Sequence, residues 1–104
     1  MEIIKDIPVR ELVPGINGHY RHAKEMTIGL VLIDKGTALP SHNHVHEQIT
    51  YMIKGELEMK IGEETVLLTP GSVQVIPSNV VHGAIAHTDC ELIDVFTPIR
   101  EDYR

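Results

Sequence analysis

The stretch from Gly36 to Gly55 constrains the fold of this chain more than any other part of its sequence. It reads GTALPSHNHVHEQITYMIKG, with histidine or glutamine at four even positions of a run rich in β-branched and aromatic residues. In an extended strand, side chains two residues apart point to the same face. His42, His44 and Gln48 are therefore expected to converge on one point inside a barrel, which is the geometry of a metal site.

The rest of the chain predicts an all-β fold. No apolar spacing typical of a helix is sustained, whereas short alternating runs separated by Gly, Pro and Asn recur about every 8 to 12 residues, as in a sandwich or barrel. A Val-Pro-Gly turn ends a first short strand, and Asn17-Gly18 is expected to form a two-residue turn. The other expected strands are 25–34, 48–54, 56–61, 65–69, 72–76, 82–87 and 90–97. At 104 residues, the chain is expected to form a single domain over residues 1–104.

Composition argues against several classes of function. The net charge is −6, no block of Lys or Arg is present, and only Phe96 and three tyrosines can stack on bases, so we expect no nucleic-acid partner. We see neither a signal peptide nor an apolar run near the about 20 residues that span a bilayer, and therefore expect a cytoplasmic protein without membrane contact. The single cysteine, Cys90, is interpreted as a small core residue.

Two spaced motifs carry a resemblance to a known family. They read Gly36-x5-His42-x-His44-x3-Gln48-x6-Gly55 and Gly71-x5-Pro77-x-Asn79-x2-His82. Together they resemble the two motifs of the cupin family, whose fold is a double-stranded β-helix or jelly-roll barrel. The sequence departs from the usual pattern at three positions. Gln48 stands where glutamate is commoner, Asn79 replaces a glycine, and Ala86 replaces an asparagine. Asn tolerates a left-handed turn, so the loop at Asn79 should be unaffected.

The resemblance implies a divalent transition metal held by His42, His44, Gln48 and His82. Three imidazoles and a carboxamide suit Zn, Ni, Fe, Mn or Cu without selecting one of them. A neutral amide in place of a carboxylate leaves the metal charge uncompensated, which favours Lewis-acid over redox chemistry. A pairing of His44 with His46 is a rival, although the glycine spacings favour His42, and a barrel that has lost its metal is the competing interpretation. The other histidines are interpreted as structural: His19, His22, His46 and His87.

The second informative stretch is the carboxyl end, residues 92–103. On the expected strand 90–97, Asp94 shares a face with Leu92 and Phe96. If that face lines the interior, the Asp94 carboxyl should have a raised pKa, useful for general acid or base catalysis. Beyond the proline that ends the strand, Arg100 can fold back over the barrel mouth and offer a bidentate fork to a carboxylate. A structural ion pair between Asp94 and Arg100 explains these residues equally well.

A small cupin with H-x-H-x3-Q and a closing Asp-Val-Phe-x-Pro-x-Arg-Glu-Asp-Tyr is similar to the KdgF family of pectin-degradation proteins. Members of that family open the ring of 4,5-unsaturated monouronates, which polysaccharide lyases release from pectin or alginate, and produce the linear keto acid. The resemblance implies a metal-dependent isomerase acting on a small unsaturated uronate, with Asp94, Phe96 and Arg100 lining the substrate site.

Two other functions and the oligomeric state stay open at this point. A cupin dioxygenase using iron or nickel would share the barrel and the histidines, and a non-catalytic sugar-binding cupin would share the barrel. We expect a homodimer in which the apolar N-terminal run supplies a strand that covers an exposed sheet. That run contains Ile3, Ile4, Ile7 and Val9, and the tyrosines whose place is undecided are Tyr20, Tyr51 and Tyr103.

Overall fold

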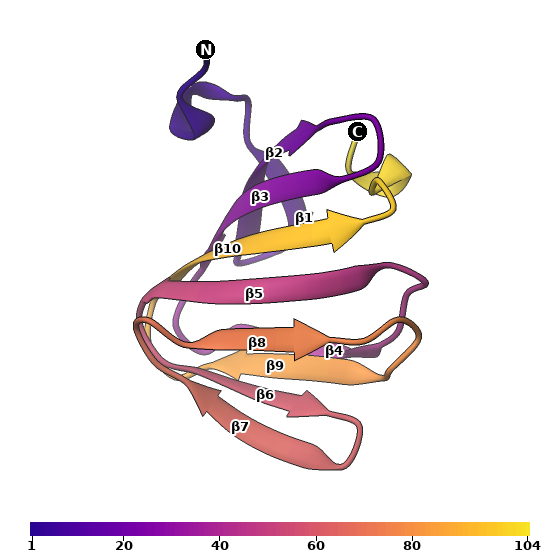
Figure 1. Ribbon diagram of the computed structural model, residues 1–104. Coiled ribbons are helices and arrows are strands. Elements are labelled where there is room, and N and C mark those ends of the chain that lie inside the picture. The colour runs from indigo at the N-terminus through magenta and orange to yellow at the C-terminus, as the bar shows by residue number, and fades with distance from the viewer.

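A computed structural model describes residues 1–104 as two antiparallel β-sheets that face each other (Figure 1). The strands are β1 (Arg10–Val13), β2 (Ile16–His22), β3 (Thr27–Ile33), β4 (Ala38–His42), β5 (Glu47–Lys54), β6 (Leu57–Ile61), β7 (Glu64–Leu68), β8 (Val73–Ile76), β9 (His82–Ala86) and β10 (Cys90–Thr97). Two 3-10 turns, η1 (Ile4–Asp6) and η2 (Glu101–Tyr103), lie near the ends of the chain. None of the helical segments has the length and apolar character needed to cross a membrane.

The strand order brings distant parts of the chain together. The larger sheet has the order β1-β2-β3-β10-β5-β8, and the smaller has the order β4-β9-β6-β7. The last strand, β10, is inserted between β3 and β5, so the carboxyl end of the chain lies in the middle of the larger sheet. This jelly-roll arrangement confirms the all-β cupin barrel expected from the sequence.

The interior has an apolar end and a polar end, and strand β5 shows the change. Its inward side chains are Gln48, Thr50 and Met52, all buried, in an alternating pattern along the strand. Met52 belongs to the apolar core, together with residues such as Ile76 and Leu92 from neighbouring strands. Gln48 and Thr50 are polar and lie toward the start of β5. A functional site is therefore confined to that end of the interior.

The prediction of a turn at Asn17-Gly18 is wrong. Both residues lie inside β2, where Gly18 pairs with Arg10 of β1 and with Val31 of β3. A side chain at Gly18 would clash with the ring of Tyr20, so this glycine makes room for a ring instead of turning the chain. The chain turns two residues before Asn17, at Gly15, whose φ of 90° is the left-handed conformation that glycine adopts readily.

The prediction that the apolar N-terminal run forms a strand for dimer formation is also wrong. Residues Ile4–Asp6 form η1, with hydrogen bonds from Asp6 N to Ile3 O (2.9 Å) and from Ile7 N to Ile4 O (3.2 Å). The next residue is Pro8, which has no N–H to donate to a strand ladder. The first strand therefore begins only at Arg10.

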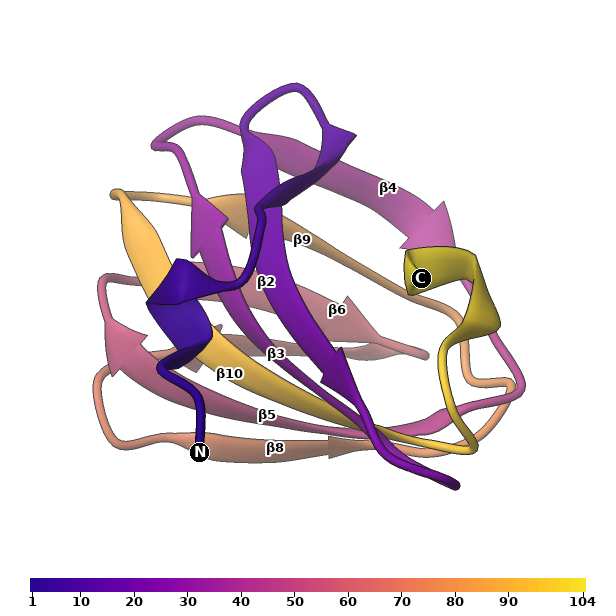
Figure 2. The same ribbon diagram turned by 90° about the horizontal axis from the view of Figure 1, so that it is seen from above.

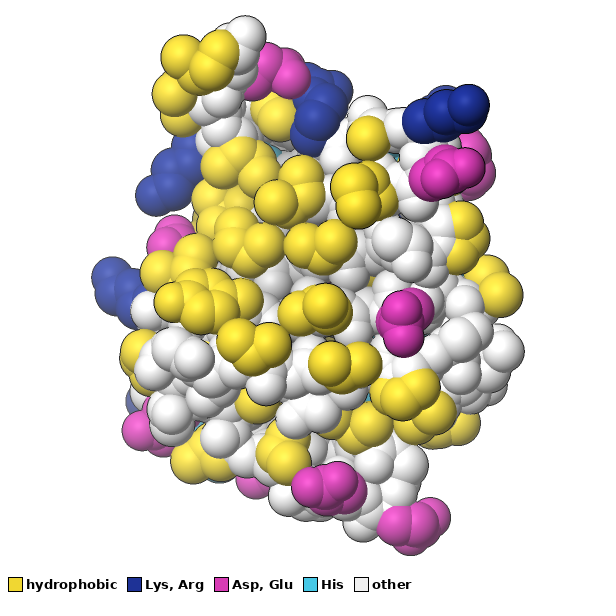
Figure 3. All heavy atoms as spheres, in the orientation of Figure 1, with side chains coloured by type: hydrophobic (Ala, Val, Ile, Leu, Met, Phe, Trp, Pro, Cys, Tyr) yellow, Lys and Arg dark blue, Asp and Glu magenta, His cyan; other side chains and the backbone are white.

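The outer face of the larger sheet carries aligned apolar side chains (Figure 3). One row crosses β3, β10, β5 and β8 in direct register, and a second row lies beside it. We call these residues the outer sheet face. The exposed members are Ile28, Ile49, Tyr51, Val73 and Val75.

Candidate active site

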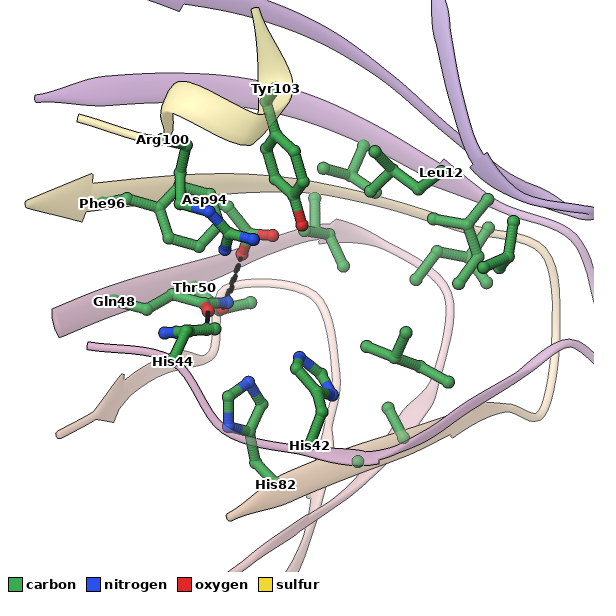
Figure 4. A pocket seen from close by; sticks show the side chains of 18 of the residues that line it. Leu12, His42, His44, Gln48, Thr50, His82, Asp94, Phe96, Arg100 and Tyr103 are labelled. Carbon is green, nitrogen blue, oxygen red and sulfur yellow. Dashed lines mark hydrogen bonds between the residues drawn. The ribbon is translucent and has the colours of Figure 1, made fainter. Parts of the chain in front are cut away.

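A cavity of about 360 Å³ opens at the polar end of the interior (Figure 4). Its polar lining includes His42, His44, Gln48, Thr50, His82, Asp94 and Arg100. Aliphatic side chains such as Leu12, Leu39 and Leu92 form much of the remaining wall. Figures 1 and 2 show the C-terminal turn η2 at the end of the barrel where β4 also ends. An apolar pocket with a few convergent polar groups is the usual form of a small-molecule site.

Three of the expected metal ligands meet on one side of the cavity. His42 is the last residue of β4 and pairs directly with His82, the first residue of β9. Together with His44, they place one ring nitrogen each within 4.8 Å of the others. The rings of His42 and His82 have centroids 4.4 Å apart. We call these three residues the histidine wall.

The histidines and Gln48 converge for a reason other than the one expected. The chain leaves β4 at His42, crosses from the smaller sheet to the larger one, and begins β5 at Glu47, so His44 lies in a loop and not on a strand. The loop is attached to the second motif, because the Asn79 N–H donates to the His44 carbonyl at 2.8 Å. Asn79 has a φ of 66°, the left-handed conformation that was expected to leave this loop intact.

Each imidazole of the histidine wall has its Nδ1 within hydrogen-bond distance of a backbone carbonyl two residues away. The distances are 2.9 Å from His42 to Pro40, 2.9 Å from His44 to His46, and 3.0 Å from His82 to Val80. A carbonyl only accepts, so each Nδ1 carries the proton and each Nε2 keeps a lone pair. Burial lowers the pKa of His44 and of His82, which favours the neutral ring that binds metals.

The carboxamide of Gln48 completes a set of lone pairs. Its Nε2 donates to Thr50 Oγ1 (2.9 Å) and to Asp94 Oδ1 (3.1 Å), which turns its Oε1 toward His44 Nε2, 3.2 Å away. With the His44 proton on Nδ1, two lone pairs face each other without a proton between them. A cation that accepts both lone pairs removes this repulsion. The donor set therefore fits a divalent transition metal, as the cupin motifs imply.

Asp94 lies on the opposite side of the cavity, on the inward face of β10 between buried Leu92 and Phe96. Its Oδ1 accepts from Thr50 Oγ1 (2.6 Å) and from Gln48 Nε2 (3.1 Å), whereas its Oδ2 has no partner in the chain and is not sealed from the cavity. Burial raises the pKa of Asp94 to about 6, against these two hydrogen bonds and the charge of Arg100. The carboxyl thus offers one oxygen to a ligand and titrates near neutral pH.

Arg100 is buried beside the cavity, with its Cζ 3.9 Å from the ring centroid of Tyr103 and 4.7 Å from that of Phe96. Its Nε and Nη2 donate to the two carboxylate oxygens of Asp102, at 3.0 and 2.8 Å. The alternative of an ion pair between Asp94 and Arg100 is therefore wrong. The fork expected to face a ligand is turned toward Asp102 of the same chain, and only Nη1 has no protein partner.

Asp102 also lines the cavity, although no role was predicted for it from the closing motif. The signal that identifies it is its position two residues after Arg100, at the start of η2. Such a short separation allows a carboxylate to reach the guanidinium edge once the chain turns.

The tyrosines left undecided by the sequence divide between the two faces of the larger sheet. Tyr20 and Tyr103 line the cavity, with ring centroids 4.7 Å apart, whereas Tyr51 belongs to the outer sheet face. The ring of Tyr20 lies against Gly18 and Gly29, and a Cβ at either glycine would clash with it. Tyr20 therefore fills the space that these glycines leave open.

Side chains from the barrel hold the C-terminal segment over the cavity. His46 Nε2 lies 3.2 Å from the Ile99 carbonyl, His22 Nε2 lies 3.3 Å from the Tyr103 carbonyl, and the Arg100 N–H donates to Thr27 Oγ1 at 3.0 Å. His46 does not line the cavity, so the geometry does not support the rival pairing of His44 with His46.

Comparison with known proteins identifies the family of this chain. Residues 29–96 match the cupin domain family, and the chain belongs to that family. The chain is 34% identical over 101 residues to the pectin degradation protein KdgF of Dickeya dadantii, covering 94% of this chain and 92% of that protein. It is also 30% identical over 92 residues to the H2HPP isomerase of Bacillus subtilis, covering 85% of this chain and 39% of that protein.

Two solved structures of similar proteins superpose closely on this chain. KdgF from Halomonas sp. superposes with a TM-score of 0.91 at 31% identity, covering 98% of this chain and 96% of that one. An RmlC-like cupin from Shewanella frigidimarina superposes with a TM-score of 0.92 at 28% identity, covering 99% and 94%.

Proposed function

We propose that this cupin is a metal-dependent isomerase of pectin or alginate breakdown that opens the ring of 4,5-unsaturated monouronates to give the linear keto uronate. One observation carries the proposal: the lone pairs of the histidine wall, the free Oδ2 of Asp94 and the free Nη1 of Arg100 all face one cavity. The similarity to KdgF of Dickeya dadantii supports this substrate class.

The proposed metal ligands are His42, His44, Gln48 and His82. All four are neutral, so a divalent ion held by them would keep its full charge and would supply Lewis-acid polarisation of a sugar oxygen. The lone pairs of His44 and Gln48, which face each other at 3.2 Å, support this assignment.

The remaining roles fall to three side chains of the carboxyl end. Arg100 binds the C6 carboxylate through Nη1. Asp94 moves a proton through Oδ2: one proton leaves the C1 hydroxyl, the bond between C1 and the ring oxygen breaks, and the resulting enolate gains one proton at C4 as it becomes a ketone. Substrate and product have the same formula, so no oxidant is needed. Phe96 packs on the sugar ring and excludes water from it.

The test is the decay of the ultraviolet absorbance of a 4,5-unsaturated monouronate, freshly made by a lyase, with purified protein and an oxygen electrode in the cell. We expect loss of the alkene signal faster than the spontaneous rate, abolished by a chelator and restored by added metal, without oxygen uptake. No acceleration by metal-replete protein would discard the proposal. Oxygen consumption would favour the dioxygenase alternative.

We also propose that the protein is a homodimer that pairs through the outer sheet face. The exposed apolar rows of that face support this, because contiguous apolar patches on soluble proteins mark interaction sites. Ile49→Lys should shift the mass measured by light scattering from dimer to monomer. Leu67→Lys, an equally exposed position on the smaller sheet, is the matched control and should leave the mass unchanged. A monomeric wild type at micromolar concentration would contradict the proposal.

A further inference from the structure

Arg100 can present only part of its guanidinium to a ligand. Its Nε and Nη2 are engaged by Asp102, and its side chain is 7% exposed. The two N–H bonds of Nη1 and the second N–H of Nη2 are left for a ligand. A carboxylate has two oxygens and about four lone-pair sites, and it normally receives two parallel N–H bonds from one arginine edge. A ligand carboxylate held by the remaining N–H bonds of Arg100 still has lone pairs that can accept from a donor of another residue.

The Tyr103 hydroxyl is a group of that kind in the lining of the cavity. Figure 4 shows it projecting into the cavity on the side of Arg100 and Asp94, and the Tyr103 ring lies under the guanidinium. Its Oη interacts with no side chain other than Arg100, and it is not sealed from the cavity, because the one sealed side-chain atom without a partner is Nδ1 of His46. Burial raises the pKa of Tyr103, so the hydroxyl keeps its proton and remains a donor.

The hydroxyl is also held in place before any ligand arrives. The Tyr20 ring packs against the Tyr103 ring at a tilt of 40°, and it lies against Gly18 and Gly29. The backbone of Tyr103 is attached to His22 at 3.3 Å. A donor that is already oriented loses little entropy on binding, which favours affinity.

We propose that Arg100 Nη1 and Tyr103 Oη form a two-donor clamp for the carboxylate of the ligand, which makes Tyr103 a specificity-determining residue. The clamp selects small hydroxylated acids over the corresponding neutral sugars. The identity of the acid rests on the proposed function, whereas the preference for a carboxylate rests on the two donors alone.

The test uses Tyr103→Phe, which keeps the stacked ring and removes only the hydroxyl. Tyr51→Phe, on the outer sheet face, is the matched control. We expect Tyr103→Phe to raise KM for the unsaturated monouronate by about tenfold or more, with little change in kcat, because a hydrogen bond to a charged ligand is lost. The control should keep both constants. A lower kcat at unchanged KM, or no effect, would overturn the clamp.

A binding measurement separates the clamp from the reaction. Isothermal titration of metal-loaded wild type and Tyr103→Phe with galacturonate and with galactose requires no turnover. The clamp predicts that wild type prefers the acid and that Tyr103→Phe loses about tenfold of this preference. An equal preference in both proteins, or none in wild type, overturns it. A Tyr103-dependent preference without ring opening would retain the clamp and discard the proposed function.

Discussion

The two sides of the cavity are built in different ways. Each imidazole of the histidine wall is oriented by a carbonyl two residues away in the sequence. The opposite side, which we call the C-terminal wall, consists of Asp94, Arg100 and Tyr103 and depends on distant partners. Thr50 bonds Asp94 across 44 positions, and His22 contacts Tyr103 across 81. The first wall follows from short motifs, whereas the second requires the completed fold.

The largest expected effect comes from the C-terminal wall. Asp94→Asn keeps the shape of the side chain and removes the group that moves the proton, so turnover should fall by about 10² to 10⁴. The measurement is kcat for the unsaturated monouronate, with metal content determined in parallel. Unchanged turnover at full metal content would show that Asp94 has no acid or base role.

Breaking the histidine wall should affect the metal first. His82→Ala removes one of the proposed ligands, and metal affinity should fall by about a hundredfold or more, since even the loss of an outer hydrogen-bond partner costs 10 to 100-fold. Metal content by mass spectrometry and activity are measured together. His46→Ala, outside the cavity, should keep its metal. If His82→Ala bound metal as well as wild type, the proposed ligand set would be wrong.

Asp94 should also make stability depend on pH in the metal-free protein. Its pKa is raised from 3.8 to about 6 on folding. The folded state therefore binds the proton more tightly, and stability is lost as pH rises from about 4 to about 6. This shift of about 2 units corresponds to about 3 kcal/mol. Asp94→Asn should lack this loss. In urea unfolding, the free energy of unfolding of the variant relative to that of wild type should therefore be higher at pH 8 than at pH 4. Equal pH profiles would contradict the burial of the charge.

The smallest expected effect is that of Asp102. Asp102→Asn weakens the ion pair that orients Arg100, but Asp102 is largely exposed, with 58% of its side chain accessible. Exposed pairs contribute about 0 to 1 kcal/mol, so KM should rise by about fivefold at most with kcat unchanged. Arg100→Lys is the companion variant and should raise KM further. A large fall in kcat for Asp102→Asn would mean that Asp102 acts in the reaction itself.

The sequence predicted the histidines of the histidine wall because the spacing of the two motifs can be read from it directly. The inward face of β10 was predictable for the same reason, since alternation is a local property. The strand parity assigned to His42, His44 and Gln48 was nonetheless wrong, because their side chains converge through a loop that crosses between sheets. The metal ligand set itself stays a prediction.

The C-terminal wall was predicted less completely. Asp94, Phe96 and Arg100 were recognised from the closing motif, but the partner of Arg100 was not. Tyr103 could not be assigned, because its place depends on Tyr20, 83 positions earlier in the printed sequence and in contact with it only after folding. The same contact explains why Asn17-Gly18 was misinterpreted: a glycine that makes room for a ring and a glycine that turns a chain look alike in a sequence.

Gly29 gives this arrangement a consequence for the diversification of the barrel. It pairs with Tyr20 on one side and with Asp94 on the other, although it contributes no side chain to the cavity. Because any side chain there would displace the Tyr20 ring, a single methyl group on β3 would move the support of Tyr103 without touching a ligand. Ligand preference in such a barrel can therefore change through substitution of Gly29, a residue that does not itself line the cavity.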